Sequence, residues 1–139
     1  LYRTLKESSG GREYFKNAIE IGNHYDLTIL QGNEPDISWG LEIGAGGIVP
    51  VCANYKPNIF LKAYKAALED DQITLRNQQE HIDYIRNILL VKPQNWIGGI
   101  MYGMASLGIG NGIPLRPLQE ITQEAKNNID SLSLTKIKK

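Results

Sequence analysis

One lysine carries the strongest indication of chemistry in this sequence. Lys6 closes a short β-type run at residues 1–6, and the residues that follow it at 7–11 (ESSGG) are small or polar. Where apolar walls enclose a lysine, desolvation disfavours the ammonium form, and the neutral amine becomes a nucleophile. Such an amine adds to a ketone, releases water and leaves an iminium, an electron sink for making or breaking a carbon–carbon bond. Position alone favours a simpler interpretation, a strand-end lysine in solvent. The elements around Lys6 must therefore decide between a catalytic and a solvent-exposed lysine.

The first part of the sequence alternates between strand-like and helix-like patterns. Helical spacing is expected at residues 12–22 and in a helix that begins near Pro35. Such alternation is typical of βα units with parallel strands. The third strand-like run is almost continuously apolar, as in a strand buried on both faces, although Pro50 removes one backbone donor. The three expected strands are residues 1–6, 27–30 and 47–53.

Beyond residue 57 the helical patterns continue without strands between them. A glycine-rich loop at residues 108–114 interrupts them, and the basic tail at 133–139 is expected to be frayed. The expected helices are residues 58–69, 72–90, 95–107 and 118–131.

Three parallel strands leave both edges of their sheet bare, so the fold needs more protein. A (β/α)₈ barrel takes about 250 residues, and three βα units with a helical extension account for its later part. The chain also begins at Leu1 and not at Met. We therefore predict an α/β fold, the C-terminal half of a (β/α)₈ TIM barrel, with the N-terminal half absent from this chain. Residues 1–57 would carry strands 6–8, and residues 58–139 the last barrel helix and a C-terminal helical extension. A small doubly wound fold stays open on periodicity alone.

Composition excludes several classes of partner. Fifteen basic residues balance fifteen acidic ones, so no overall field attracts nucleic acid or an anionic membrane. No apolar run approaches the roughly 18 residues of a membrane-spanning helix. Cys52 is the single cysteine, which is compatible with a reducing compartment, and we expect a cytoplasmic protein. His24 and His81 have no partner at ligand spacing, so no metal site is expected.

Four segments resemble, in order and spacing, one family of enzymes. Residues 5–10 (LKESSG) closely resemble the lysine motif of the dihydrodipicolinate synthase and N-acetylneuraminate lyase family of class I aldolases. Residues 44–57 (GAGGIVPVCANYKP) are similar to a later glycine-rich strand and its Ala-Asn pair, and the other two matches are residues 30–34 (LQGNE) and 112–118 (GIPLRPL). The resemblance covers nearly the whole chain and raises the catalytic interpretation of Lys6 above the solvent one.

The resemblance implies a role for each matched residue. Lys6 would be the catalytic residue that forms a Schiff base with pyruvate, and the backbone carbonyl of Val49 would approach this lysine and the bound keto acid. For Glu34 an alternative is equally good, an acid at a helix N-terminus beside Pro35. No metal and no cofactor is implied. The substrate-binding candidates are Ser8, Gly32, Asn33, Glu34 and Val49.

Three positions depart from the family pattern. Thr4, Gly11 and Pro50 stand where the family usually has glycine, aspartate and serine. They support one alternative, a binding or regulatory member that kept the barrel without turnover. The family's paired acids for sialic acid are also not reproduced, because the turn at residues 33–35 offers only one carboxylate, which argues against a neuraminate lyase.

The expected function is therefore that of a class I lyase or aldolase, similar to dihydrodipicolinate synthase, acting on pyruvate or a related 2-oxo acid and an aldehyde. A 2-keto-3-deoxygluconate-type sugar-acid aldolase is the alternative within the family. The resemblance also implies a proton-relaying tyrosine and a carboxylate-binding threonine or serine pair on strands of the N-terminal half. This chain alone should then be inactive, with that half supplied on the same polypeptide or by a separate chain. Helices at residues 72–107 suggest a homo-oligomer, a dimer or a tetramer.

Overall fold

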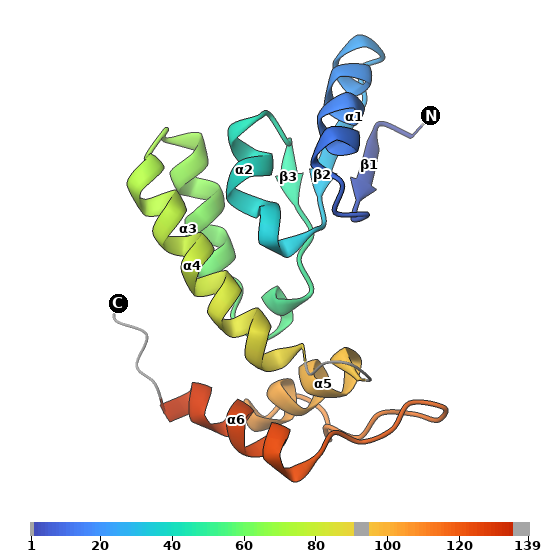
Figure 1. The fold of residues 1–139 in the computed structure, drawn as a ribbon, viewed down its shortest axis with the longest axis vertical. Helices are drawn as coiled ribbons and strands as arrows, with labels where there is room; N and C mark the ends of the chain where they lie inside the picture. Colours follow the sequence, from blue (N-terminus) through green and yellow to red (C-terminus); the bar gives the residue numbers. More distant parts are fainter. Residues whose placement is uncertain (1, 91–94, 135–139) are drawn as a thin grey trace. The chain divides into compact units, whose positions relative to one another are not determined.

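A computed structural model of the protein describes residues 2–90 and 95–134. Three short strands, β1 (Thr4–Glu7), β2 (Thr28–Gln31) and β3 (Gly47–Ile48), form a parallel sheet in the order β1-β2-β3 (Figure 1). The register pairs Lys6 with Leu30 and Leu30 with Gly47. The carboxyl ends of the three strands therefore lie at one edge of the sheet, as the alternating pattern predicts.

Helix α1 (Arg12–His24) connects β1 to β2 and packs on the sheet. Its buried residues Phe15 and Ile19 are four positions apart, so they lie on one face of the helix, where they cluster with Ile29 of β2. Gly22 allows this close approach. A Cβ at Gly22 would contact the backbone oxygen of Leu27 and lie 3.0 Å from Cγ1 of Ile29.

A short 3₁₀ turn, η1 (Glu34–Asp36), and helix α2 (Ile37–Glu42) connect β2 to β3. Pro35 lies in the first turn of η1, as expected. A second 3₁₀ turn, η2 (Cys52–Asn54), follows β3 and precedes α3 (Pro57–Leu68) and α4 (Gln72–Leu89).

The chain divides into two compact units. The first contains the sheet, α1, α2, α3 and α4 up to Asp83. The second contains residues 54–56 and the described residues from 84 onward, with α5 (Trp96–Ser106) packed on α6 (Gln123–Leu134). In this second unit burial raises the pKa of the Tyr55 hydroxyl. The predicted division of the chain at residues 57 and 58 stays a prediction.

The sheet has one covered and one open face. Successive side chains of a strand point to opposite faces. Ile29 and Gln31 are buried on the side of α1 and α2, whereas Lys6 is exposed and Leu30 half-buried on the other side. No described helix covers the Lys6 face in the first unit. This is the face that would line the interior if the sheet were closed into a barrel.

The third strand is shorter than expected. The pattern predicts a strand at residues 47–53, but β3 ends at Ile48. Val49 still donates a hydrogen bond from its backbone N–H to the oxygen of Gln31 at 2.9 Å. Successive N–H groups of a strand alternate sides, so the donor that Pro50 lacks would lie on the side away from β2. The N–H of Cys52 is bonded to a side chain instead of to a strand.

The last helix begins later than expected. The predicted start at residue 118 is wrong, because α6 begins at Gln123 after Thr122, whose hydroxyl accepts a hydrogen bond from the N–H of Ala125 at 3.2 Å. The helix continues to Leu134, so the first two residues of the tail predicted to fray are helical. Residues 135–139 lie outside the described residues.

No helix in the described part of the chain is long and apolar enough to cross a membrane.

The packing of α1 on β2 predicts where the sheet unit is sensitive to truncation. Ile29 is 4% exposed in the cluster with Phe15 and Ile19. We expect Ile29→Ala to lower the free energy of unfolding by about 2–4 kcal/mol, because it leaves a cavity. The same change at Ile73, which is 76% exposed on α4, should cost at most about 0.5 kcal/mol. Urea unfolding of both variants measures the difference, and equal losses would show that this cluster does not hold α1 on the sheet.

Candidate functional site

Lys6 lies against the turn that follows β2, which we call the β2 turn (residues 32–36). The N–H of Gly32 donates to the backbone oxygen of Glu7 at 2.7 Å. A Cβ at Gly32 would lie 2.6 Å from Cε of Lys6 and 2.8 Å from the same Glu7 oxygen, and it would contact Oγ of Ser8. Glycine therefore leaves room for the lysine side chain at this point. The structure brings together three residues that the sequence singled out, Lys6, Ser8 and Gly32.

The loop after β1 is held by its own acidic residue. Glu7 is buried, on the opposite face of the strand from Lys6, and its carboxylate accepts a hydrogen bond from the N–H of Ser9 at 2.6 Å. The side chain of Lys6 is exposed. The apolar walls expected around it are not formed by the described residues, because a sheet of three strands leaves that face uncovered.

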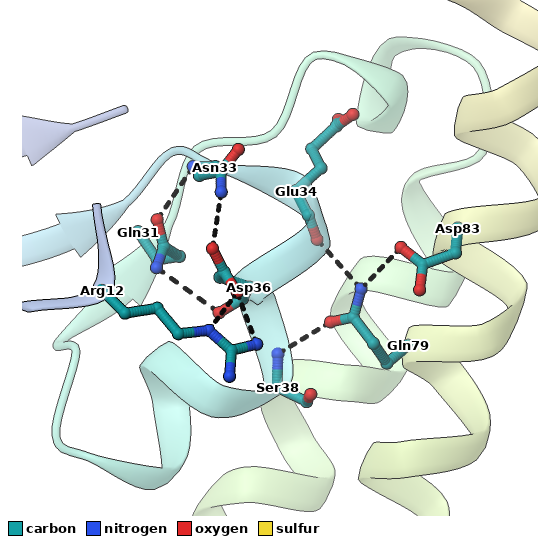
Figure 2. A network of polar contacts seen from close by, with 8 residues as sticks. All are labelled: Arg12, Gln31, Asn33, Glu34, Asp36, Ser38, Gln79 and Asp83. Carbon is teal, nitrogen blue, oxygen red and sulfur yellow. Dashed lines mark hydrogen bonds and ion pairs between the residues drawn. The ribbon is translucent and has the colours of Figure 1, made fainter. Parts of the chain in front are cut away.

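A polar network joins the β2 turn to the start of α1 (Figure 2). The side-chain oxygen of Gln31 accepts a hydrogen bond from the N–H of Asn33 at 2.8 Å, and the amide of Asn33 donates to Oδ2 of Asp36 at 2.6 Å. The other carboxylate oxygen of Asp36 accepts from Nε of Arg12 at 2.7 Å, with a second guanidinium nitrogen also at 2.7 Å. The predicted substrate residue Asn33 is thus bonded within the protein.

Sequence reasoning missed Arg12, Gln31 and Asp36 as parts of this site. Two signals point to them. Gln31 is an amide at the end of an otherwise apolar strand, and Asp36 follows Pro35 in a turn at the carboxyl edge of the sheet. No local pattern connects Arg12 to either of them.

Glu34 makes the second connection from the β2 turn. It is 4% exposed, and its carboxylate accepts hydrogen bonds from the N–H of Cys52 at 2.6 Å and from the Cys52 thiol at 3.2 Å. Glu34 begins η1, in agreement with the helix N-terminal interpretation, and its carboxylate binds the segment after β3. The role of Glu34 in substrate binding stays a prediction.

A third connection leads from the β2 turn to α4. The side-chain amide of Gln79 donates to the backbone oxygen of Glu34 at 3.0 Å and to Asp83 at 3.0 Å, and its oxygen accepts from the N–H of Ser38 at 2.9 Å (Figure 2). The β2 turn and the start of α2 are therefore both bonded to α4, more than forty positions later in the sequence.

Val49, the last of the predicted site residues, directly follows β3. Its hydrogen bond to Gln31 extends the ladder by one residue past Ile48, and its side chain is partly exposed. It therefore lies at the same edge as Lys6 and Gly32. The approach of its carbonyl to a keto acid stays a prediction.

In residues 2–90 and 95–134, no three His, Cys, Asp or Glu side chains come together as a metal site.

An apolar groove lies beside the free edge of β3. It measures about 380 Å³ and runs between the end of β3 and one side of α3. Its lining includes Ile48, Pro50, Phe60, Leu61 and Tyr64.

Known proteins resemble this chain in sequence and in structure. Residues 3–135 match the dihydrodipicolinate synthetase family. An uncharacterized DapA-like lyase of Halobacterium salinarum is 27% identical over 128 residues, which are 91% of this chain and 40% of that protein. Dihydrodipicolinate synthase from Bacteroides thetaiotaomicron has a similar structure, with a TM-score of 0.85 and 24% identity over 95% of this chain and 46% of that one.

A prophage protein of the dihydrodipicolinic acid synthase family from E. coli K12, solved in complex with pyruvate, aligns with a TM-score of 0.82 and 16% identity over 94% of this chain and 45% of its own. The chain thus spans less than half the length of these relatives. The structural likeness confirms the predicted fold class, part of a (β/α)₈ barrel followed by helices, and excludes the doubly wound alternative. Because the family match covers nearly all of its residues, the chain belongs to the dihydrodipicolinate synthetase family.

Proposed function

We propose that Lys6 forms a Schiff base with pyruvate or a related 2-oxo acid, as the nucleophile of a class I lyase similar to dihydrodipicolinate synthase. The observation that carries this proposal is the position of Lys6. It stands at the carboxyl edge of a parallel sheet, on the face that no described helix covers, with its side chain passing over Gly32. In barrels of this kind that edge holds the reacting groups.

The covalent step joins the amine of Lys6 to the keto acid. Neutral Nζ adds to the ketone carbon, the carbonyl oxygen takes up protons and leaves as water, and a C=N⁺ iminium remains. Loss of a proton from the neighbouring carbon gives an enamine, which adds to the carbon of an aldehyde, and hydrolysis then returns the amine. Pyruvate is the keto acid proposed because the E. coli relative was solved in complex with it.

The residues around Lys6 are proposed to bind the substrate. Ser8 lies against Gly32 beside the lysine, and Val49 lies at the same edge of the sheet. Asn33 and Glu34 belong to the same proposal, although both already bond to protein groups, and any contact with substrate would use their remaining donor and acceptor positions.

The active form is proposed to be an assembled barrel, meaning this chain together with the N-terminal half of the barrel. Both outer edges of the sheet are unpaired within the described residues, and the apolar groove between β3 and α3 would accept a further strand and the side chains that cover it.

The family resemblance also supports a homo-oligomer, a dimer or a tetramer, which sedimentation of the assembled barrel tests. A cytoplasmic location belongs to the same proposal, since the single cysteine, Cys52, is buried and forms no disulfide.

Reductive trapping tests the Schiff base directly. We expect the assembled barrel, incubated with pyruvate and borohydride, to gain the mass of one pyruvic acid less one oxygen atom, and peptide mapping should place the adduct on Lys6. Lys6→Ala should abolish the adduct, because no other amine is expected at this edge. Lys16→Ala removes an exposed lysine from α1 and should leave trapping unchanged.

Trapping also separates the proposal from its main alternative. A folded assembled barrel that binds pyruvate without forming an adduct would support the non-catalytic binding member and rule out the Schiff base. An adduct of equal yield in Lys6→Ala would assign the chemistry to another lysine.

Gly32 gives a second test at the same position. Gly32→Ala places a methyl group 2.6 Å from Cε of Lys6, so we expect the lysine to be displaced and the rate of adduct formation to fall about tenfold or more. At Gly11 an added Cβ makes only ordinary contacts, 3.5 Å to Cβ of Tyr14, and Gly11→Ala serves as the control. Unchanged trapping in Gly32→Ala would show that Lys6 reacts from a different position.

A further inference from the structure

We propose that the ion pair between Arg12 and Asp36 is a positioning device: it fixes the loop after β1 (residues 8–11, the Lys6 loop) over the β2 turn and so sets the rate at which Lys6 reacts. Both are positioning residues and neither is expected to touch the substrate. The inference rests on the proposed function in one respect, that Lys6 is the reacting residue.

Asp36 is placed as an anchor. Its side chain is 11% exposed, and its two carboxylate oxygens accept hydrogen bonds from Asn33 and from Arg12 at 2.6 and 2.7 Å. The backbone oxygen of Asp36 also accepts from the side-chain amide of Gln31 at 3.4 Å. Because the carboxylate is nearly buried and already bound to the β2 turn, it offers a fixed point to a group from outside that turn.

Arg12 is that group, and the stability of its own helix does not explain its position. It is the first residue of α1, where the helix dipole disfavours a cation, and the preceding Gly11 gives the helix no side-chain cap. The ion pair with Asp36 offsets the unfavourable interaction of the guanidinium with the helix dipole. The guanidinium also lies over the ring of Trp39 at 5.0 Å from its centre, and Trp39 packs on Phe15.

The segment between Lys6 and Arg12 is short and flexible in composition. It ends in two glycines, and Gly10 has a φ of +79°. A Cβ at Gly10 would lie 3.3 Å from the side-chain nitrogen Nδ2 of Asn33, so the loop already runs close to the β2 turn. The sheet holds the loop at Glu7 and Asp36 holds it at Arg12. With Arg12 released, the glycines would let the segment that bears Ser8 move away from Gly32.

The chain offers a matched control. Arg3 and Asp26 form another arginine–aspartate pair that joins the segments preceding the same two strands, at the opposite ends of β1 and β2. Their side chains are 80% and 87% exposed and 3.5 Å apart. A general effect of losing an Arg–Asp pair on the sheet would appear in both places, whereas an effect on Lys6 should appear at Arg12 alone.

The experiment compares Arg12→Met, Arg12→Lys, Asp36→Asn and Arg3→Met in the assembled barrel. The first measurement is the rate of pyruvate adduct formation at saturating pyruvate, with the pyruvate concentration that gives half the maximal rate. We expect Arg12→Met to lower the maximal rate about ten- to a hundredfold and to change the half-saturating concentration little, because geometry and not binding is altered. Arg12→Lys should recover part of the loss, and Arg3→Met should stay within about twofold of the parent.

The second measurement is independent of the chemistry. Amide hydrogen exchange at Ser9 and Gly32, whose N–H groups bond to Glu7, should become faster in Arg12→Met and Asp36→Asn and stay unchanged in Arg3→Met. The double variant Arg12→Met with Asp36→Asn should lose little more than either single variant, since the two residues act through one contact.

The outcomes separate this inference from the proposed function. No adduct in the parent protein would reject the Schiff base and with it an effect of the pair on the rate, and exchange at Ser9 and Gly32 would still decide whether the pair holds the loop over the β2 turn. Trapping in Arg12→Met at the rate of Arg3→Met would overturn the positioning role while leaving the Schiff base in place. Unchanged exchange in Arg12→Met would overturn it as well. A lower melting temperature of Arg12→Met with an unchanged trapping rate would show that the pair only stabilises the fold and does not position Lys6.

Discussion

The hydrogen bonds of the β2 turn hold the loops of the first unit in one arrangement. Asp36 binds the start of α1, the Glu34 carboxylate binds the segment after β3, and the Glu34 backbone oxygen binds α4 through Gln79. The acceptors on this turn are buried, and a buried polar group left unpaired costs about 1–3 kcal/mol. Each loop therefore has one favourable place, and the edge of the sheet that carries Lys6 is defined by these bonds as well as by the strands.

The strands supply the other half of the geometry. Parallel pairing brings the carboxyl ends of β1, β2 and β3 to one edge, and the alternation of side chains turns Lys6 and Glu7 to opposite faces. Glu7 is used on the covered side to hold the loop after β1, while Lys6 points to the uncovered side. Gly32 then allows the lysine to cross the neighbouring turn. A side chain at that one position would conflict with the lysine, with Ser8 and with the backbone of β1.

The elements that could be predicted were those whose pattern is local. The spacing of Phe15 and Ile19 predicts α1 correctly, and the apolar runs predict β1 and β2 to within a few residues. The third strand was overestimated because an apolar run does not reveal that the N–H of Cys52 is bonded to the side chain of Glu34 and not to a neighbouring strand. The start of α6 was missed because Thr122 acts as its cap four residues after the expected beginning.

The sequence by itself determined the family, the alternation of strands and helices and the candidate for the reacting residue, because each depends on the order of neighbouring residues. Lys6, Ser8 and Gly32 could be singled out in this way. Only the tertiary structure decided which groups hold them in place. Arg12 and Asp36 are 24 positions apart, and Glu34 and Cys52 are 18 apart. A hydrogen bond depends on distance and direction in space, so the partner of each buried polar group is settled only when the helices have packed on the sheet.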